Sequence, residues 1–404
     1  MSLSLCVIVK NEEKSLPKCL SSVKNIVNEI VVVDTGSTDK TREIARQFGG
    51  KVYDFQWCDD FSIARNEALK YVTGKWVLVL DADETLKPEI VPQLKAAIAT
   101  DKYILINLIR QELGSVQSPY SLVSRLFRNH ANIKFSRPYH ALVDDSITEI
   151  IKKESYWKIG YLSNVAIIHS GYQKAVIDHQ NKHGKAITAM RKFYQDHPDD
   201  IYVCSKLGAL YVEMGEISQG LMLLAKGLNL ILESGDQGEN INYDILYELH
   251  YHLGIAYGRL GNSIQAIHHY DAAVNLPVYG FLKLGSYNNL GNLLKVQGDL
   301  LGAKMAYELA IGIDANFITG YYNLGMVCKA MGLWVEAINA YDQAISLNPD
   351  YAQAYQNLGV VLLKIGDVQN SLIAFENAIA LHEQYNPQEA ERLKQGLKEM
   401  GFCY

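Results

Sequence analysis

The sequence lacks several features that mark common classes of protein. No apolar run reaches the roughly 18–20 residues that a membrane-spanning helix requires, and the first residues resemble a strand more than a signal peptide. The six cysteines are scattered, with no Cys-x-x-Cys pair, which favours reduced thiols over a disulfide framework. These absences predict a soluble, cytoplasmic protein without a membrane span.

An excess of positive charge is also absent. The 404 residues include 38 Lys and Arg against 44 Asp and Glu, so a net charge of −6 gives no reason to expect nucleic acid as a partner. No Gly-x-Gly-x-x-Gly turn follows the first expected strand, which argues against the usual dinucleotide-binding fold. Hydrophobic residues make up 49% of the chain, which is typical of globular proteins, and the length predicts two domains.

The N-terminal part of the chain alternates between strand and helix patterns. Apolar runs at residues 3–9, 30–33 and 76–80 are typical of strands buried on both faces, and segments with helical periodicity separate them. Strand–helix–strand alternation predicts an α/β domain with parallel strands and right-handed crossovers.

Acidic residues follow two of these strands. Asp34 ends the second run, and Asp81-Ala82-Asp83 follows the run at 76–80. Ligands of open α/β sheets bind beyond the carboxyl ends of the strands, so these acids are expected at the mouth of a crevice. Asp81 and Asp83 can share one face and hold a divalent cation together with substrate phosphates, while Ala82 turns away. Helix capping or a solvated loop is the alternative for each acid.

Four ordered motifs resemble those of glycosyltransferase family 2. They are Asn11-Glu12-Glu13, Asp34-Thr35-Gly36-Ser37-Thr38-Asp39, Asp60-Phe61-Ser62-Ile63-Ala64-Arg65-Asn66 and Asp81-Ala82-Asp83. The third looks most like the branch that contains bacterial peptide S-glycosyltransferases and lipopolysaccharide-core transferases. The resemblance covers about residues 1–172 and implies a GT-A fold, a Rossmann-like mixed sheet. It further implies sugar transfer from a nucleotide-sugar, such as a UDP-sugar, with inversion and with Mn²⁺ or Mg²⁺.

The resemblance also assigns roles to individual residues. Asp83, Asp81 and His169, which closes the last expected strand, would be the metal ligands; for His169, a hydrogen-bonded core histidine is the alternative. Asp34 would bind the base or ribose, with a helix N-cap as its alternative. The residues that would contact the nucleotide-sugar are Lys10, Asn11, Glu12, Asp34, Arg65, Asp81, Ala82 and Asp83.

The general base is not identified by the resemblance. In relatives, the segment corresponding to Tyr139-His140-Ala141 commonly reads His-Glu, and that Glu is a natural candidate for deprotonating the acceptor, whereas this chain has Ala141. A base must come within hydrogen-bond reach of the acceptor proton, and the substitutes are Asp144, Asp145 and Glu84. The sequence does not choose among them, and a non-catalytic scaffold or nucleotide-sugar-binding protein is the alternative.

From about residue 200 the pattern changes to repeats of about 34 residues. All spacings are counted from the glycine of each Leu-Gly pair. A second glycine follows it after seven residues, a small residue after 12, and a large apolar or aromatic residue after 16. This resembles the tetratricopeptide repeat, in which antiparallel helix pairs bury their faces by stacking on their neighbours. The Leu-Gly glycines are Gly208, Gly254, Gly291, Gly325 and Gly359.

Three segments are therefore predicted along the chain. Residues 1–172 would form the transferase domain, and residues 173–199 a helical connector. Residues 200–404 would form an all-α solenoid of about five repeats that ends in a capping helix.

Asparagines stand two positions before the last three Leu-Gly glycines. Asn289, Asn323 and Asn357 would line the inner groove as a ladder for an extended peptide backbone, similar to that of nucleocytoplasmic protein O-GlcNAc transferases. Hydrogen bonds between repeats or plain surface polarity are the alternative. The repeats are thus expected to bind a protein or peptide acceptor or partner, or to form a homo-oligomer.

Overall fold

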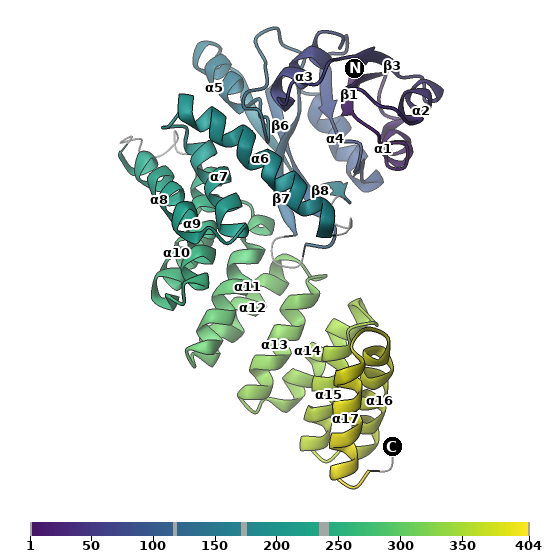
Figure 1. The fold of residues 1–404 in the computed structure, drawn as a ribbon, viewed down its shortest axis with the longest axis vertical. Helices are drawn as coiled ribbons and strands as arrows, with labels where there is room; N and C mark the ends of the chain where they lie inside the picture. The colour runs from purple at the N-terminus through teal and green to yellow at the C-terminus, as the bar shows by residue number, and fades with distance from the viewer. Residues whose placement is uncertain (1, 116–118, 171–175, 234–241, 403–404) are drawn as a thin grey trace. The chain divides into compact units, whose positions relative to one another are not determined.

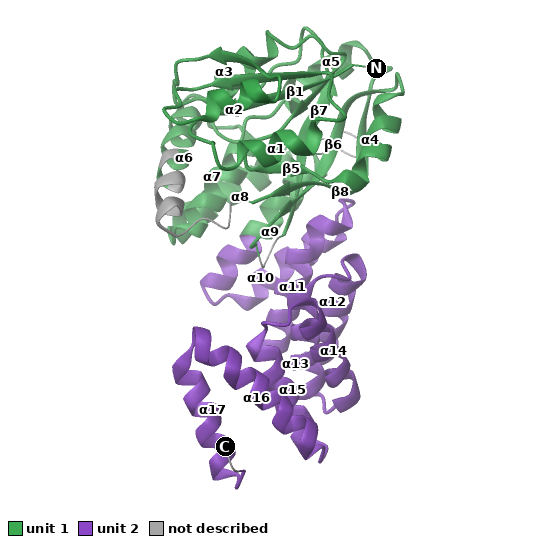
Figure 2. Cartoon of the chain, turned by 90° about the vertical axis from the view of Figure 1, so that its right-hand side faces the viewer, with its two compact units in different colours: residues 1–252 green, residues 253–404 purple. Residues whose placement is uncertain are grey.

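The structure, a computed structural model, describes residues 2–115, 119–170, 176–233 and 242–402. It consists of two compact units, residues 1–252 and 253–404, which are green and purple in Figure 2. The first unit contains a sheet with flanking helices, and the second is helical. Each unit is described by itself.

The first unit contains an eight-stranded mixed sheet with the order β3-β2-β1-β4-β7-β6-β8-β5. The strands β1 to β4 pair in parallel, and β7 pairs antiparallel with both β4 and β6. β8 runs parallel to β6 and antiparallel to β5. The strands are β1 (Leu3–Val9), β2 (Glu29–Asp34), β3 (Lys51–Asp54), β4 (Trp76–Val79), β5 (Glu84–Leu86), β6 (Tyr103–Glu112), β7 (Tyr120–Arg128) and β8 (Lys158–His169). The predicted α/β fold with a mixed sheet is confirmed.

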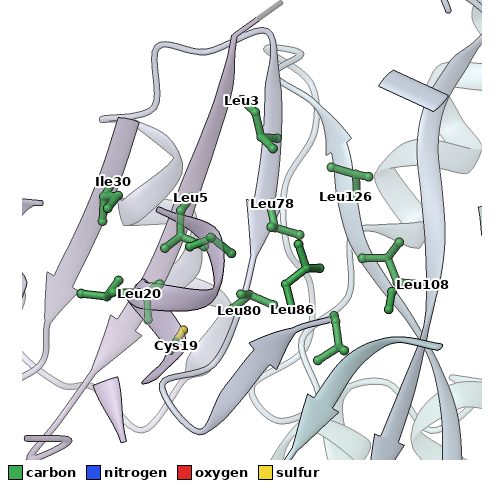
Figure 3. Close-up of a cluster of buried hydrophobic side chains, with 14 of the residues drawn as sticks. Leu3, Leu5, Cys19, Leu20, Ile30, Leu78, Leu80, Leu86, Leu108 and Leu126 are labelled. Carbon is green, nitrogen blue, oxygen red and sulfur yellow. The ribbon is translucent and has the colours of Figure 1, made fainter. Parts of the chain in front are cut away.

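Helices cover both faces of this sheet (Figure 1). On one face lie α1 (Leu16–Val23), α2 (Thr41–Gln47) and α4 (Val91–Ile98), which follows a 3-10 turn at Pro88–Ile90. On the other lie α3 (Phe61–Leu69) and α5 (Asp144–Lys153). Because both faces are covered, β1 is apolar at nearly every position: Leu5 packs with Leu20 and Leu78 on one side (Figure 3), and Cys6 packs on the other.

After β8, all the regular secondary structure of the described chain is helical. The first unit continues with α6 (Val176–Asp196), α7 (Ile201–Glu213), α8 (Ile217–Glu233) and α9 (Tyr243–Arg259), and the division between the units falls within α9. The second unit contains α10 (Ser263–Asn275), α11 (Gly280–Val296), α12 (Leu300–Ile313), α13 (Ile318–Ala330), α14 (Trp334–Leu347), α15 (Ala352–Lys364), α16 (Val368–Tyr385) and α17 (Pro387–Glu399). The predicted helical repeat architecture is confirmed. Among the described residues, no helix is both long and apolar enough to cross a bilayer.

The repeat pattern has a steric cause. A methyl group on Gly325 would lie 2.6 Å from Cε1 of Tyr341, the fully buried aromatic residue 16 positions later. The glycine therefore lets the two helices of a hairpin approach across a buried ring. The second glycine of the same repeat, Gly332, has φ +73° and ends its helix in the left-handed conformation that glycine adopts without strain.

We predict opposite effects for two glycine-to-alanine substitutions in the second unit. Gly325→Ala should lower the free energy of unfolding by about 1–3 kcal/mol because it overpacks the Tyr341 ring. Gly312→Ala, in α12 with open space around the new methyl group, should raise it by roughly 0.5 kcal/mol. Urea unfolding followed by circular dichroism measures both. Equal effects of the two variants would show that the close approach does not constrain the repeat.

Candidate functional site

The acids of the second and fourth motifs lie at one edge of the sheet. β1 pairs in parallel with β2 and with β4, so the carboxyl ends of these strands lie side by side. Asp34 is the last residue of β2, and Asp81 and Asp83 follow β4 in the turn that leads to β5. Ala82, between the two aspartates, is buried. The strand pairing thus brings Asp34, Asp81 and Asp83 to the same edge of the sheet.

The Asp34 carboxylate is bonded within the turn that follows β2, and it is not a helix N-cap, because the N-cap of α2 is Lys40. Asp34 Oδ1 accepts hydrogen bonds from the backbone of Gly36 (3.0 Å) and Ser37 (2.9 Å), which caps the following turn, and from Arg42 Nε (2.8 Å). Burial acts to raise the pKa of Asp34, but the bonds from Ser37 and Arg42 outweigh it and the pKa is lowered. Its Oδ2 is buried without a hydrogen-bond partner among the described residues. That oxygen is the atom on Asp34 that remains for a ligand.

The first motif is fastened to the turn after Asp34. The N–H of Asn11 donates to Ser37 Oγ (2.9 Å), and the N–H of Thr38 donates to Asn11 Oδ1 (2.8 Å). Asn11 has φ +56°, a conformation that asparagine tolerates better than most residues. These bonds hold exposed Lys10 and half-buried Glu12 next to the Asp34 edge.

The third motif forms α3 and fixes it in place. Asp60 is the N-cap of α3 and accepts from two backbone N–H groups. The amide of Asn66 bonds the backbone of Phe135 in both directions, at 2.9 and 2.7 Å. Arg65 is 5% exposed, and its Nη2 donates to Asp81 Oδ1 at 2.8 Å. Arg65 is therefore part of the site and is not a solvent-exposed helix residue.

The Asp81 carboxylate is held by two arginines. Arg65 bonds Oδ1, and Arg125 Nη2 of β7 bonds Oδ2 at 2.9 Å. Burial acts to raise the pKa of Asp81, but Arg125 and Arg65 hold it well below its usual range. The backbone of Asp81 is fixed as well, because its N–H donates to Glu84 Oε2 (2.8 Å) and Glu84 Oε1 accepts from Arg110 (2.8 Å).

Asp83 pairs with His169 instead. β5 and β8 are antiparallel with Glu84 opposite His169, which brings His169 Nε2 to 3.3 Å from Asp83 Oδ2. The other ring nitrogen, Nδ1, bonds Glu112, which is paired in turn with Arg110 at 2.7 Å. Burial acts to lower the pKa of His169, but the bonds to Asp83 and Glu112 raise it to about 9.

These contacts separate the three residues expected to bind metal. Asp83 and His169 meet, whereas Asp81 is committed to its arginines, and no group of three His, Cys, Asp or Glu able to hold a metal occurs among the described residues. Asp83 and His169 still fit Mn²⁺ or Mg²⁺, because such ions are often bound by one or two protein ligands plus substrate phosphates. Glu112 on the other ring nitrogen is the type of partner that orients a metal-binding histidine.

Three charged residues of the site were missed by the sequence analysis. Arg110 and Glu112 end β6, and Arg125 lies within β7. The available signal was their charge inside otherwise apolar strands. Their partners depend on the pairing of β7, β6 and β8, which local patterns do not specify.

The three candidates for the base have different surroundings. Glu84 is fully buried, and each of its oxygens is bonded within the site. Asp145 is about half exposed and is paired with Arg137 at 2.7 Å. Asp144 Oδ1 accepts from Ser124 (2.9 Å), its Oδ2 is buried with no partner among the described residues, and burial raises its pKa.

The asparagines of the repeats all hydrogen-bond to the preceding repeat. Asn323 is buried, and its amide donates to Asn288 at 2.8 Å. Asn289 donates to Tyr270 at 3.2 Å, and Asn357 donates to Tyr322 at 3.3 Å. These are the bonds between repeats that the alternative interpretation describes.

Comparison with known proteins gives matches over both parts of the chain. A family model described as glycosyl transferase family 2 matches residues 4–160, and tetratricopeptide repeat models match residues 247–277, 284–317, 327–366 and 352–385. The chain is 40% identical over 308 residues to a TPR repeat-containing protein of Synechococcus elongatus, covering 76% of this chain and 74% of that protein.

Two further relatives are described as glycosyltransferases. The prophage-derived glycosyltransferase SunS of Bacillus subtilis is 26% identical over 247 residues, which cover 59% of this chain and 56% of SunS. An uncharacterized glycosyltransferase of Rickettsia felis is 30% identical over 178 residues, which cover 42% of this chain and 62% of that protein. The chain spans less than two thirds of the length of both.

We predict that the two aspartates of Asp81-Ala82-Asp83 differ in their effect on stability. Asp81→Asn leaves two buried arginines without their carboxylate and should lower the free energy of unfolding by about 3 kcal/mol. Asp83→Asn should lower it by less than about 1 kcal/mol, because His169 keeps its bond to Glu112. Urea unfolding at pH 7 measures both values. Equal losses would contradict the division of roles between them.

Proposed function

Because the chain belongs to glycosyltransferase family 2 and carries tetratricopeptide repeats, we propose that it transfers a hexose from a UDP-sugar, with inversion, to an acceptor that the repeats recruit. The observation that carries the proposal is the meeting of Asp83 and His169, 3.3 Å apart, at the sheet edge where β2 ends in Asp34. The proposed extents are residues 1–172 for the transferase domain, 173–199 for the connector and 200–404 for the repeats.

The donor nucleotide would lie along the ends of β1 and β2. Asp34 Oδ2 can accept a hydrogen bond from a ribose hydroxyl or a base imide, because it has no partner among the described residues. Lys10, Asn11 and Glu12 follow β1 at the same end of the sheet, because Val9 lies opposite Asp34 and Asn11 is bonded to the turn at Ser37.

The diphosphate would lie beyond β4, next to Asp83 and His169. A divalent cation there, Mn²⁺ or Mg²⁺, would neutralise the charge that develops on the departing diphosphate. Asp83 and His169 would hold the ion, and Glu112 would keep the imidazole oriented. Arg65 and Arg125 would keep Asp81 in place and add positive charge near the diphosphate.

Asp144 is our candidate for the base. A carboxylate whose pKa is raised by burial binds a proton more strongly near neutral pH than an ordinary aspartate does, which is the property a general base requires. Both oxygens of Glu84 accept hydrogen bonds, one from the N–H of Asp81 and one from Arg110, and Asp145 is paired with Arg137.

The acceptor is proposed to be a protein or peptide held by the second unit. Tetratricopeptide repeats are interaction modules, and Asn289, Asn323 and Asn357 would contribute to such a ligand site beside their present bonds between repeats. Cytoplasmic location and self-association stay predictions. A non-catalytic scaffold is the second candidate, favoured by Ala141 in the segment where relatives commonly have a Glu that is a natural candidate for the base.

We predict that the purified protein releases UDP from one member of a panel of UDP-sugars only when Mn²⁺ is present. Asp83→Ala should lower the rate at least about 100-fold, because it removes a ligand of the ion. Asp101→Ala, which removes an exposed acid paired with Arg128, is the control and should leave the rate unchanged. Release that does not depend on Asp83 would overturn the metal assignment, and partner binding without any release would favour the scaffold.

We predict that turnover falls with decreasing pH through the raised pKa of Asp144. The base must be deprotonated, so the rate is full above that pKa and is lost below it, in the acid limb of the profile. Asp144→Asn should remove this limb and lower the rate by about 10²–10⁴-fold, whereas Asp145→Asn should keep the limb. An unchanged acid limb in Asp144→Asn would assign the base elsewhere.

A further inference from the structure

A narrow loop at residues 136–142 is held in an unfavourable conformation. Backbone bonds between Ser136 and Leu142, at 2.8 and 3.2 Å, close the loop. Inside it, Arg137 has φ +73° and His140 has φ +52°. Left-handed backbone costs a residue with a side chain about 1–2 kcal/mol, so contacts from outside the loop must hold it.

One set of outside contacts comes from the start of α7. Arg137 Nη2 lies 2.9 Å from Asp200 Oδ2, and its guanidinium lies 5.0 Å from the Tyr202 ring. The Tyr202 hydroxyl donates to the carbonyl of His140 at 3.3 Å. Asp200 is also the N-cap of α7, so one carboxylate begins the helix and binds the loop. On its other side, Arg137 pairs with Asp145 of α5.

The loop in turn holds α3. The N–H of Phe61, the first residue of α3, donates to the Pro138 carbonyl at 2.9 Å. The rings of Phe61 and Tyr139 pack edge to face with their centroids 5.8 Å apart. α3 carries Arg65, which holds Asp81 at the candidate site. A continuous chain of contacts therefore runs from α7 through the loop to Asp81.

We propose that Arg137 is a positioning residue through which α7 fixes the loop, and through the loop α3 and the Arg65–Asp81 pair, for sugar transfer. The proposal rests on the proposed function, because it concerns the rate of that same reaction. According to this proposal, α7, the first helix after the connector, contributes to the rate of turnover. This contribution is separate from any binding of a ligand by the repeats. Arg137 acts on the site through backbone placement, and it need not touch the donor.

Substitution of Asp200 by asparagine tests this link with little effect on α7 itself. Asn is as good an N-cap as Asp, so Asp200→Asn keeps the helix start and removes the charge that binds Arg137. Asp199→Asn is the matched control, because Asp199 is adjacent and exposed and pairs with Lys226 instead. Arg137→Lys keeps a positive charge but loses the fork that bonds two carboxylates at once.

The measurements are UDP release from the active UDP-sugar with Mn²⁺, and amide hydrogen exchange at Ser136 and Leu142. Asp200→Asn and Arg137→Lys should lower kcat about tenfold or more, leave KM for the UDP-sugar within about twofold, and speed exchange at both amides. Asp199→Asn should change none of these. A merely structural role would speed exchange and leave kcat unchanged.

Three results would overturn the proposal. The first is an exchange rate in Asp200→Asn equal to that in Asp199→Asn. The second is faster exchange in Asp200→Asn and Arg137→Lys with an unchanged kcat. The third is a rise in KM in these two variants that accounts for the whole loss of rate. A wild-type protein that releases no nucleotide from any UDP-sugar would instead overturn the proposed function. In that case, hydrogen exchange still decides whether α7 holds the loop.

Discussion

The interaction on which the candidate site depends is the Asp81 carboxylate between Arg65 and Arg125. It joins the turn after β4 to α3 on one side and to β7 on the other. Each of these charges, brought out of water alone, would cost several kcal/mol, so none is stable there without the others. The fold must therefore bring α3, β4 and β7 together in one register before the site exists. Asp83, two residues further on, is then placed against His169.

This constraint separates two aspartates that look equivalent in the sequence. Alternation along an extended chain allows both side chains to face one ligand. It does not determine which of the two aspartates forms ion pairs with neighbouring arginines. In the structure Asp81 has a buried counter-charge on each oxygen, and Asp83 faces an imidazole that a second carboxylate, Glu112, orients. Asp81 thus serves the architecture of the edge, and Asp83 carries the carboxylate that we propose for binding the ion.

The sequence predicts features that depend on neighbouring residues along the chain, and it does not predict contacts between distant segments. The strands around Leu5 and Leu78 and the glycines of the repeats are visible because hydrophobic periodicity and close helix packing leave local patterns. Arg125 and Glu112 could not be assigned partners, because these depend on which strands pair across the sheet. The position of Asn323 is visible in the repeat spacing, but its bond to Asn288 depends on how two repeats stack.

The position of α7 changes what the helical part of the chain is expected to do. If the helices only recruited an acceptor, no charged pair would need to join them to the transferase sheet. Asp200 instead caps α7 and binds Arg137, in a loop whose backbone is costly to maintain. The helices from α10 onward form a separate unit with its own contacts between repeats. Binding of an acceptor and placement of the reacting residues can therefore reside in different helices, and substitutions in one set need not affect the other.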